Sequence, residues 1–206
     1  MTGAADSALD PADLAPSWLG QFERWHAEAS RSGLAEPDAM VLATAAADGR
    51  PSARTVLLKG VDDRGFEFFT NLGSRKGREL LENPRASLVF PWYALRRQVV
   101  VVGDVEPVSP GRSDAYFASR PYGSRIGALA SRQSSTIDSR EQLERAAEEL
   151  EARYPATGEV PRPAWWGGLR VRPHSVEFWQ GRRNRLHDRL RFREEAGAWV
   201  VERLSP

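Results

Sequence analysis

The sequence predicts a mainly β fold with added helices (β+α), in which a β-barrel of mostly antiparallel strands carries helical insertions. Segments rich in alternating or β-branched residues follow one another through short turns that contain Gly, Asp or Pro, as in antiparallel hairpins. Strands and helices do not alternate regularly, and the sequence contains neither GxGxxG nor GxxxxGK[ST]. These absences argue against a doubly wound nucleotide-binding fold.

The elements follow in order along the chain. A helix begins near Trp18, because apolar residues recur at three- and four-residue steps as far as Ala29. A β-meander comes next, and then a short helix that ends at Asn83-Pro84. A second hairpin and two Ser-capped helices follow, and a Pro- and Gly-rich connection leads to three closing strands. The predicted strands cover residues 39–46, 51–61, 66–70, 86–93, 98–108, 169–180, 188–195 and 198–204, and the predicted later helices cover residues 74–84, 109–121 and 139–154.

Length and composition set the class of protein. The 206-residue chain is expected to form one domain over residues 16–206, after a disordered tail (residues 1–15) that has almost nothing to bury. Lys and Arg (29) nearly balance Asp and Glu (28), so bulk charge predicts no binding to nucleic acid or to a membrane. There is no cysteine, and no carboxylate cluster surrounds a histidine, so no metal site is expected. Without a signal peptide or a membrane-length apolar run, a cytoplasmic protein is expected.

Two stretches place cations where an anion could bind. Arg54 and Lys59 stand at the ends of RTVLLK, but residues five apart face opposite sides of a strand, so solvated strand ends are the simpler interpretation. In TNLGSRKG (70–77), a helix begins at Ser74, Arg75 and Lys76. Free N–H groups, a hydroxyl and two cations at a helix N-terminus are what a phosphate requires. The alternative is an ordinary Ser-capped helix, although cations there oppose the helix dipole.

Two later stretches are polar without an evident structural reason. Tyr116 and Arg120 are four residues apart and would share a helix face, so a phenol and a guanidinium could hold one anion beside Ser124. The alternative is ordinary decoration of a helix surface. In SRQSS (131–135), Gln133 and Ser134 could cap a helix or hydrogen-bond a ligand.

The stretch RLHDR (185–189) is the most unusual. On a strand, its residues Arg185, His187 and Arg189 alternate and are predicted to share one face. Three cationic or titratable side chains on one face repel one another unless an anionic or electron-rich group lies opposite. His187 would add a hydrogen-bond donor or acceptor near neutral pH. A basic edge-strand face is the alternative.

Taken in order, these segments resemble the pyridoxamine/pyridoxine 5′-phosphate oxidases, flavoenzymes of vitamin B6 metabolism. The resemblance extends from about Phe22 to the C-terminal ERLSP, and it is carried by RTVLLK, FFTNLGSRKGRELLENPRASLVFPW, RQVVVVG, YFASRP, SRQSS, EFWQG and RLHDR. It implies a split β-barrel and a homodimer with two FMN sites at the interface. The residues implied to bind FMN are Arg54, Thr55, Val56, Leu57, Leu58, Lys59, Phe69, Thr70, Arg75, Lys76, Gln98, Gln133, Ser134, Trp179 and Arg189. The residues implied to bind the substrate are Lys59, Tyr116, Arg120, Ser124, Arg185, Leu186 and His187, with Arg185 and His187 as the catalytic pair against the pyridine ring.

The resemblance also implies a reaction and marks two departures. Pyridoxine or pyridoxamine 5′-phosphate would be oxidised at C4′ by dioxygen to pyridoxal 5′-phosphate, with hydrogen peroxide as the second product and ammonia released from the amine. Phe69 stands where the family usually has Tyr. Family members often carry a basic, Tyr-containing N-terminal segment that folds over the substrate, whereas this chain has no Arg, Lys or Tyr in its first 18 residues.

Two other functions remain open on the same scaffold. A flavin oxidase of the phenazine-biosynthesis type would act on a larger tricyclic substrate and would be expected to lose the residues that hold a substrate phosphate. A non-catalytic carrier of flavin or pyridoxal phosphate would have no need of Arg185 and His187. This chain retains both sets of residues, which favours the B6 substrate.

Overall fold

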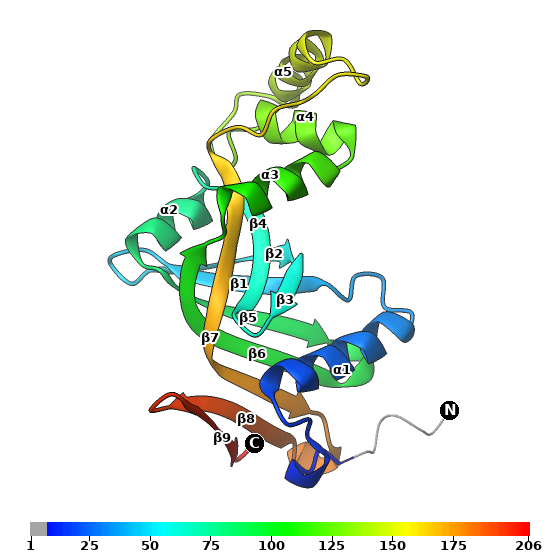
Figure 1. Cartoon of the computed structure of the whole chain (residues 1–206), viewed down its shortest axis with the longest axis vertical. Coiled ribbons are helices and arrows are strands. Elements are labelled where there is room, and N and C mark those ends of the chain that lie inside the picture. Colours follow the sequence, from blue (N-terminus) through cyan, green and yellow to red (C-terminus); the bar gives the residue numbers. More distant parts are fainter. Residues whose placement is uncertain (1–7) are drawn as a thin grey trace.

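The computed structural model describes residues 8–206, and in them nine strands form one antiparallel sheet in the order β2-β1-β5-β6-β7-β4-β3, with β8 and β9 attached through β7 (Figure 1). The strands are β1 (Ala39–Ala45), β2 (Pro51–Leu57), β3 (Gly60–Asp62), β4 (Gly65–Asn71), β5 (Arg85–Trp92), β6 (Arg97–Pro107), β7 (Trp166–Gln180), β8 (Asp188–Glu195) and β9 (Ala198–Arg203). The helices are α1 (Trp18–Arg31), α2 (Arg75–Glu82), α3 (Pro110–Ser119), α4 (Tyr122–Ala130) and α5 (Arg140–Arg153). Three short 3-10 turns cover Pro11–Asp13, Tyr93–Leu95 and Arg183–Arg185.

This arrangement confirms the predicted mainly β fold with added helices. One predicted strand, 51–61, is in fact two, because β2 pairs with β1 whereas β3 pairs with β4, and the chain changes partner at Leu58 and Lys59. Helix α4 was not predicted from the sequence; it begins directly after α3, with Pro121 as its N-cap residue. The two glycines of α4, Gly123 and Gly127, hide its helical periodicity.

The main core lies between α1 and the curled sheet. Phe22 of α1 is fully buried, and its ring packs edge-on against Phe66 and Phe90, both at 4.9 Å between centroids. Trp25, one turn further along α1, meets Phe178 of β7 at 5.3 Å. Fully burying an aliphatic or aromatic side chain contributes about 1.5–3 kcal/mol, so this aromatic cluster accounts for much of the attachment of α1.

The segment before α1 differs from the expected tail. Leu9 is buried in the main core, and its backbone N–H donates to Asp188 at 3.1 Å. Arg203 donates to the carbonyl oxygen of Leu9 at 3.2 Å. The expectation of disorder as far as residue 15 was therefore wrong for this part, because a single leucine and its backbone find partners in the last strands. The rest of that expectation concerns residues 1–7, which lie outside the described residues.

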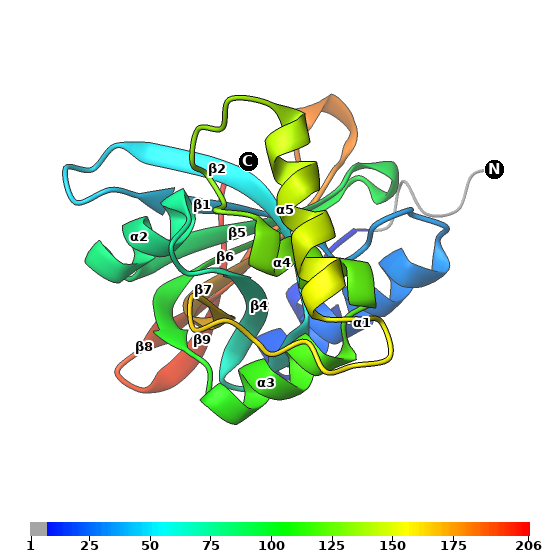
Figure 2. The same ribbon diagram turned by 90° about the horizontal axis from the view of Figure 1, so that it is seen from above.

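β7 organises the molecule along its length. Its first residues pair with β4, its last residues pair with β8, and β6 runs beside it from Leu169 to Gln180, with a register shift between Val102 and Gly103. At the N-terminal end of β7, helices α3, α4 and α5 gather around a second apolar cluster of Phe117, Ile126 and Trp166. Figure 1 shows these helices at one end of the molecule, with β8 and β9 at the other, and in Figure 2, seen from above, α5 lies in front of the sheet.

Candidate active site

A cavity of about 500 Å³ lies where the helical end meets the sheet. Its wall comes from the end of β2, from β4, from the first turn of α2, from the α3–α4 region and from the start of β7. The residues that line it are Thr55, Val56, Leu57, Lys59, Phe69, Thr70, Asn71, Lys76, Tyr116, Arg120, Ser124, Gly127, Ala128, Ser131, Gln133 and Trp166. Eleven of the residues implied by the resemblance are therefore brought to one cavity.

Lys76 supplies a buried positive charge to this cavity. Its Nζ donates to Gln133 Oε1 at 2.8 Å, to Thr70 Oγ1 at 3.2 Å and to Ser74 Oγ at 3.4 Å. Burial lowers the pKa of Lys76, and the positive charge of Arg54 lowers it further. Because these three acceptors are neutral, the ammonium group is hydrogen-bonded but its charge is not balanced by them, which favours the entry of an anion.

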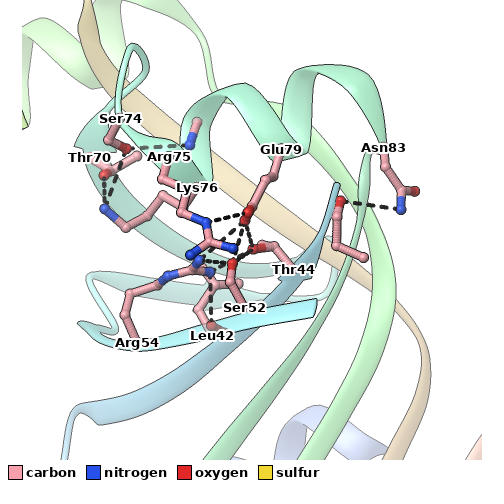
Figure 3. A network of polar contacts seen from close by, with 12 residues as sticks. Leu42, Thr44, Ser52, Arg54, Thr70, Ser74, Arg75, Lys76, Glu79 and Asn83 are labelled. Atoms are coloured by element: carbon pink, nitrogen blue, oxygen red, sulfur yellow. Dashed lines mark hydrogen bonds and ion pairs between the residues drawn. The ribbon is translucent and has the colours of Figure 1, made fainter. Parts of the chain in front are cut away.

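Arg54 and Arg75 lie beside the cavity and meet at one carboxylate, that of Glu79 (Figure 3). Arg54 Nη2 lies 3.2 Å from Glu79 Oε2, and Arg75 Nε lies 2.8 Å from Glu79 Oε1. Burial alone would raise the pKa of Glu79, but hydrogen bonds from Ser52, Thr44, Arg75 and Arg54 outweigh it and lower the pKa to about 2. Glu79 is therefore ionised at any pH at which the protein works. Sequence reasoning missed this residue, since nothing in RELLE marks one glutamate as buried.

Arg120 carries a polar atom that lacks a partner. Its Nη1 is buried and has no hydrogen-bond partner within residues 8–206. The guanidinium lies over the ring of Trp166 at 4.9 Å, and Tyr116 stacks on Phe69 at 4.1 Å between centroids. Burial lowers the pKa of Arg120, while Tyr116 acts in the opposite direction. A buried, unpartnered guanidinium nitrogen costs about 1–3 kcal/mol, which a bound anion would recover.

Leu58 and Ser134, two of the residues implied to bind FMN, do not line this cavity. The side chain of Leu58 is buried in the main hydrophobic core, so this residue could offer a ligand only its backbone. Ser134 has a left-handed backbone (φ 72) and lines a neighbouring cavity between α4 and α5. Trp166, in contrast, lines the main cavity and was missed, because AWWGG looks like part of the preceding loop.

The remaining predicted residues form a second group at the far end of β7. Gln98 pairs with Trp179 across β6 and β7, and Trp179 pairs with Arg189 across β7 and β8. The ring of His187 lies 4.6 Å from that of Trp179, and its Nδ1 accepts a hydrogen bond from the backbone of Arg182 at 3.0 Å. The neutral imidazole therefore carries its proton on Nε2.

The expectation that Arg185, His187 and Arg189 share one strand face was wrong. β8 begins at Asp188, and Arg185 ends a 3-10 turn with left-handed backbone (φ 61). Exposed Leu186 follows it. Arg189 is on the strand, and there it forms a two-point ion pair with Glu177 (2.7 and 3.0 Å), whose hydrogen bonds raise the pKa of Arg189.

The two groups are far apart within one chain. Trp166, in the cavity wall, and Trp179, in the second group, both belong to β7 and are thirteen residues apart. At about 3.3 Å per residue, the path along the strand is about 40 Å. Figure 1 shows the two ends of β7 at opposite ends of the molecule. One chain therefore does not bring the two groups into a single site.

Comparison with known proteins identifies the family of this chain. Residues 27–154 match the family model described as pyridoxamine 5′-phosphate oxidase. The chain belongs to this family. Residues 166–206 match the model for the pyridoxine 5′-phosphate oxidase C-terminal dimerisation region, which indicates a homodimer. No helix within residues 8–206 is long and apolar enough to cross a membrane.

Relatives match over nearly the whole chain. A pyridoxine/pyridoxamine 5′-phosphate oxidase of Frankia alni is 61% identical over 96% of this chain and 84% of the relative. One from Salinispora arenicola is 56% identical, over 98% and 92%. Among solved structures, PhzG from Burkholderia lata, in complex with tetrahydrophenazine-1-carboxylic acid, has a TM-score of 0.91 at 35% identity and covers 98% of this chain and 100% of its own. An FMN-binding protein from Nostoc punctiforme shares the fold, with a TM-score of 0.73 at 20% identity over 94% of this chain and 100% of its own. The predicted split β-barrel is thus confirmed.

Proposed function

We propose that this protein is an FMN-dependent oxidase that converts pyridoxine or pyridoxamine 5′-phosphate to pyridoxal 5′-phosphate. Dioxygen is reduced to hydrogen peroxide, and oxidation of the amine also takes up water and releases ammonia. The observation that carries the substrate class is the buried Nη1 of Arg120, which has no hydrogen-bond partner among residues 8–206, because Lys59, Tyr116 and Ser124 line the same cavity. Together these groups match one phosphate. The names of the relatives in Frankia alni and Salinispora arenicola support the same substrate.

The residues around Lys76 fit the phosphate end of FMN. Lys76 and Thr70 lie in the cavity wall, Gln133 contacts Lys76, and Arg75 stands at the start of the same helix. These side chains would hold the flavin phosphate, and Thr55 to Leu57 would line the ring system along β2. FMN, when bound, supplies the hydride acceptor and the group that dioxygen reoxidises.

The complete site would need two chains. The cavity group of one protomer and the group of Gln98, Trp179, His187 and Arg189 of its partner would face each other across the interface, because one chain holds them at opposite ends of β7. Residues 166–206 contain most of the second group, and they match a dimerisation region.

Within such a site, this chain's residues have separate roles. Lys59, Tyr116 and Arg120 bind the substrate phosphate, and Arg185 lies against the pyridine ring. His187 can donate a hydrogen bond from Nε2 to an oxygen or nitrogen of the ring substituents, since its Nδ1 is occupied by the backbone of Arg182. Fixing the ring in this way contributes through orientation rather than through covalent chemistry.

The test is anaerobic reduction of the FMN-loaded protein. Pyridoxine 5′-phosphate should bleach the flavin, and unphosphorylated pyridoxine should do so with a kcat/KM lower by about 10²- to 10⁴-fold, since two charge-assisted bonds at about 1.5–3 kcal/mol each are lost. Equal efficiency for the two compounds would refute the assignment of Lys59 and Arg120. Bleaching by a dihydrophenazine carboxylic acid, with no response to the B6 compounds, would instead favour the phenazine-type reaction.

A further inference from the structure

Glu79 is a buried carboxylate placed among cations. Its side chain is 7% exposed, and both of its oxygens are used: Oε2 accepts from Ser52 at 2.6 Å and from Arg54 at 3.2 Å, and Oε1 accepts from Arg75 at 2.8 Å. Thr44 of β1 also donates to Oε2. Glu79 thus joins α2 to two strands of the sheet at one point (Figure 3).

The charge of this cluster remains positive. Arg54, Arg75 and Lys76 carry three positive charges and Glu79 carries one negative charge, which leaves a net charge of about +2. A phosphate monoester carries about −1.5 to −2 at neutral pH. Glu79 therefore does not neutralise the cations; it leaves an excess that a single phosphate balances.

The geometry shows what Glu79 does for each arginine. Arg54 uses Nη1 for Leu42 O and Thr44 and uses Nη2 for Ser52 and Glu79, so its guanidinium is held on two sides. Arg75 is 59% exposed, and Glu79 engages it through Nε. A guanidinium has five N–H donors, so the bond from Nε to Glu79 anchors Arg75 while N–H groups on its Nη atoms can serve a ligand.

We propose that Glu79 is a positioning residue that sets the affinity for the flavin phosphate by fixing Arg54 and Arg75. This inference rests on the proposed binding of FMN. The carboxylate does not touch the phosphate; it orders the two guanidinium groups before the phosphate arrives, so that binding does not have to order them.

The proposed role of Glu79 and simple charge repulsion predict opposite changes in FMN affinity when the carboxylate is removed. A negative charge this close to a phosphate repels it, so removal of the charge alone should tighten the binding of FMN. If the carboxylate instead orders the arginines, its loss should weaken binding, because two long side chains must then be immobilised by the ligand. Glu79→Gln keeps the size of the side chain and removes the charge, and it distinguishes the two effects by direction.

The experiment titrates the apoprotein with FMN and with riboflavin, which lacks the phosphate, and follows the quenching of flavin fluorescence. Glu79→Gln is expected to raise the Kd for FMN by about tenfold to hundredfold and to leave the Kd for riboflavin within about twofold. The matched control is Glu82→Gln, which makes the same charge change at an exposed position of the same helix and should alter neither value. General damage to the fold would weaken both ligands together, so the ratio of the two Kd values reports positioning alone.

Ser52→Ala is a milder second variant. It removes one donor to Glu79 and the hydroxyl that accepts from Arg54 Nη2, without removing the charge, so it loosens the same cluster and should shift the ratio in the same direction by about twofold to tenfold. This variant decides the matter if Glu79→Gln does not fold. An unchanged ratio, or tighter binding of FMN by Glu79→Gln, would overturn the role of Glu79 while leaving the proposed function intact. An unaltered protein that binds neither flavin would overturn the proposed function itself.

Discussion

Mixed dimers test whether the site is built from two chains. Arg120→Ala removes a cavity residue, and His187→Ala removes a residue of the second group, at the opposite end of β7. Each variant alone should retain about 1% of the activity, because loss of a positioning or proton-handling group typically costs about 10²-fold or more. In a dimer with one chain of each kind, one site combines both altered groups and the other combines both intact groups. Purified mixed dimers should therefore recover about half of the unaltered activity, and an equal random mixture should recover about a quarter.

The assay is peroxide release by co-expressed variants that carry different affinity tags, purified on both tags in sequence. The control pairs Arg120→Ala with Lys59→Ala, two residues of the same cavity, and this mixture should stay near 1%, since every site then contains one altered residue. If the mixed Arg120/His187 dimers show no recovery, each site is formed within one chain, and the separation of the groups along β7 has been misinterpreted.

Three further predictions follow from individual contacts. Gly168→Ala would place a Cβ 2.6 Å from the ring of Phe69, so it should lower the free energy of unfolding in urea by about 1–3 kcal/mol and displace this wall of the cavity. An unchanged free energy of unfolding would show that Phe69 can move aside without cost. Trp166→Leu removes the ring beneath Arg120, so it should raise KM for pyridoxine 5′-phosphate about tenfold with little change in kcat or in the amount of bound FMN. A loss of bound FMN would contradict the assignment of this part of the cavity to the substrate. The pKa of Glu79 is lowered from 4.5 to about 2, so its contribution to stability is complete above pH 4.5 and is lost as the pH falls toward 2. Urea unfolding in that window should depend less on pH in Glu79→Gln than in the unaltered protein, and equal slopes would refute the depressed pKa.

The sequence predicted most strands and helices because their signals are local. The run of valines in the strand 98–108 and the apolar spacing from Trp18 to Ala29 correspond closely to β6 and α1. The break at Leu58 was not predictable in this way, since it depends on which strand each half of RTVLLKGV pairs with. Such pairing is a property of residues distant in sequence.

The cavity was predicted better than the second group. Lys76, Tyr116 and Arg120 meet because short segments bring them to one end of the sheet, whereas RLHDR alternates in sequence without being a strand. Left-handed backbone at Asn184 and Arg185 interrupts the extended chain there, and neither residue is a glycine that would have signalled it. The binding and catalytic roles carried over from the family stay predictions.

The contacts of Leu9 have a consequence for how the chain reaches its folded state. Leu9 bonds to Asp188 and to Arg203, which are 179 and 194 positions later in the sequence, and Arg203 also holds Asp188 at 3.0 Å. These bonds lie directly beside the turn that carries Arg185 and His187. During synthesis the bond to Asp188 cannot form before residue 188 has been added, and the two bonds of Arg203 cannot form before residue 203, so this turn acquires its full support only after both. Contacts this distant in sequence are slow to close, and the nascent protein should therefore gain its cavity before it gains the turn opposite.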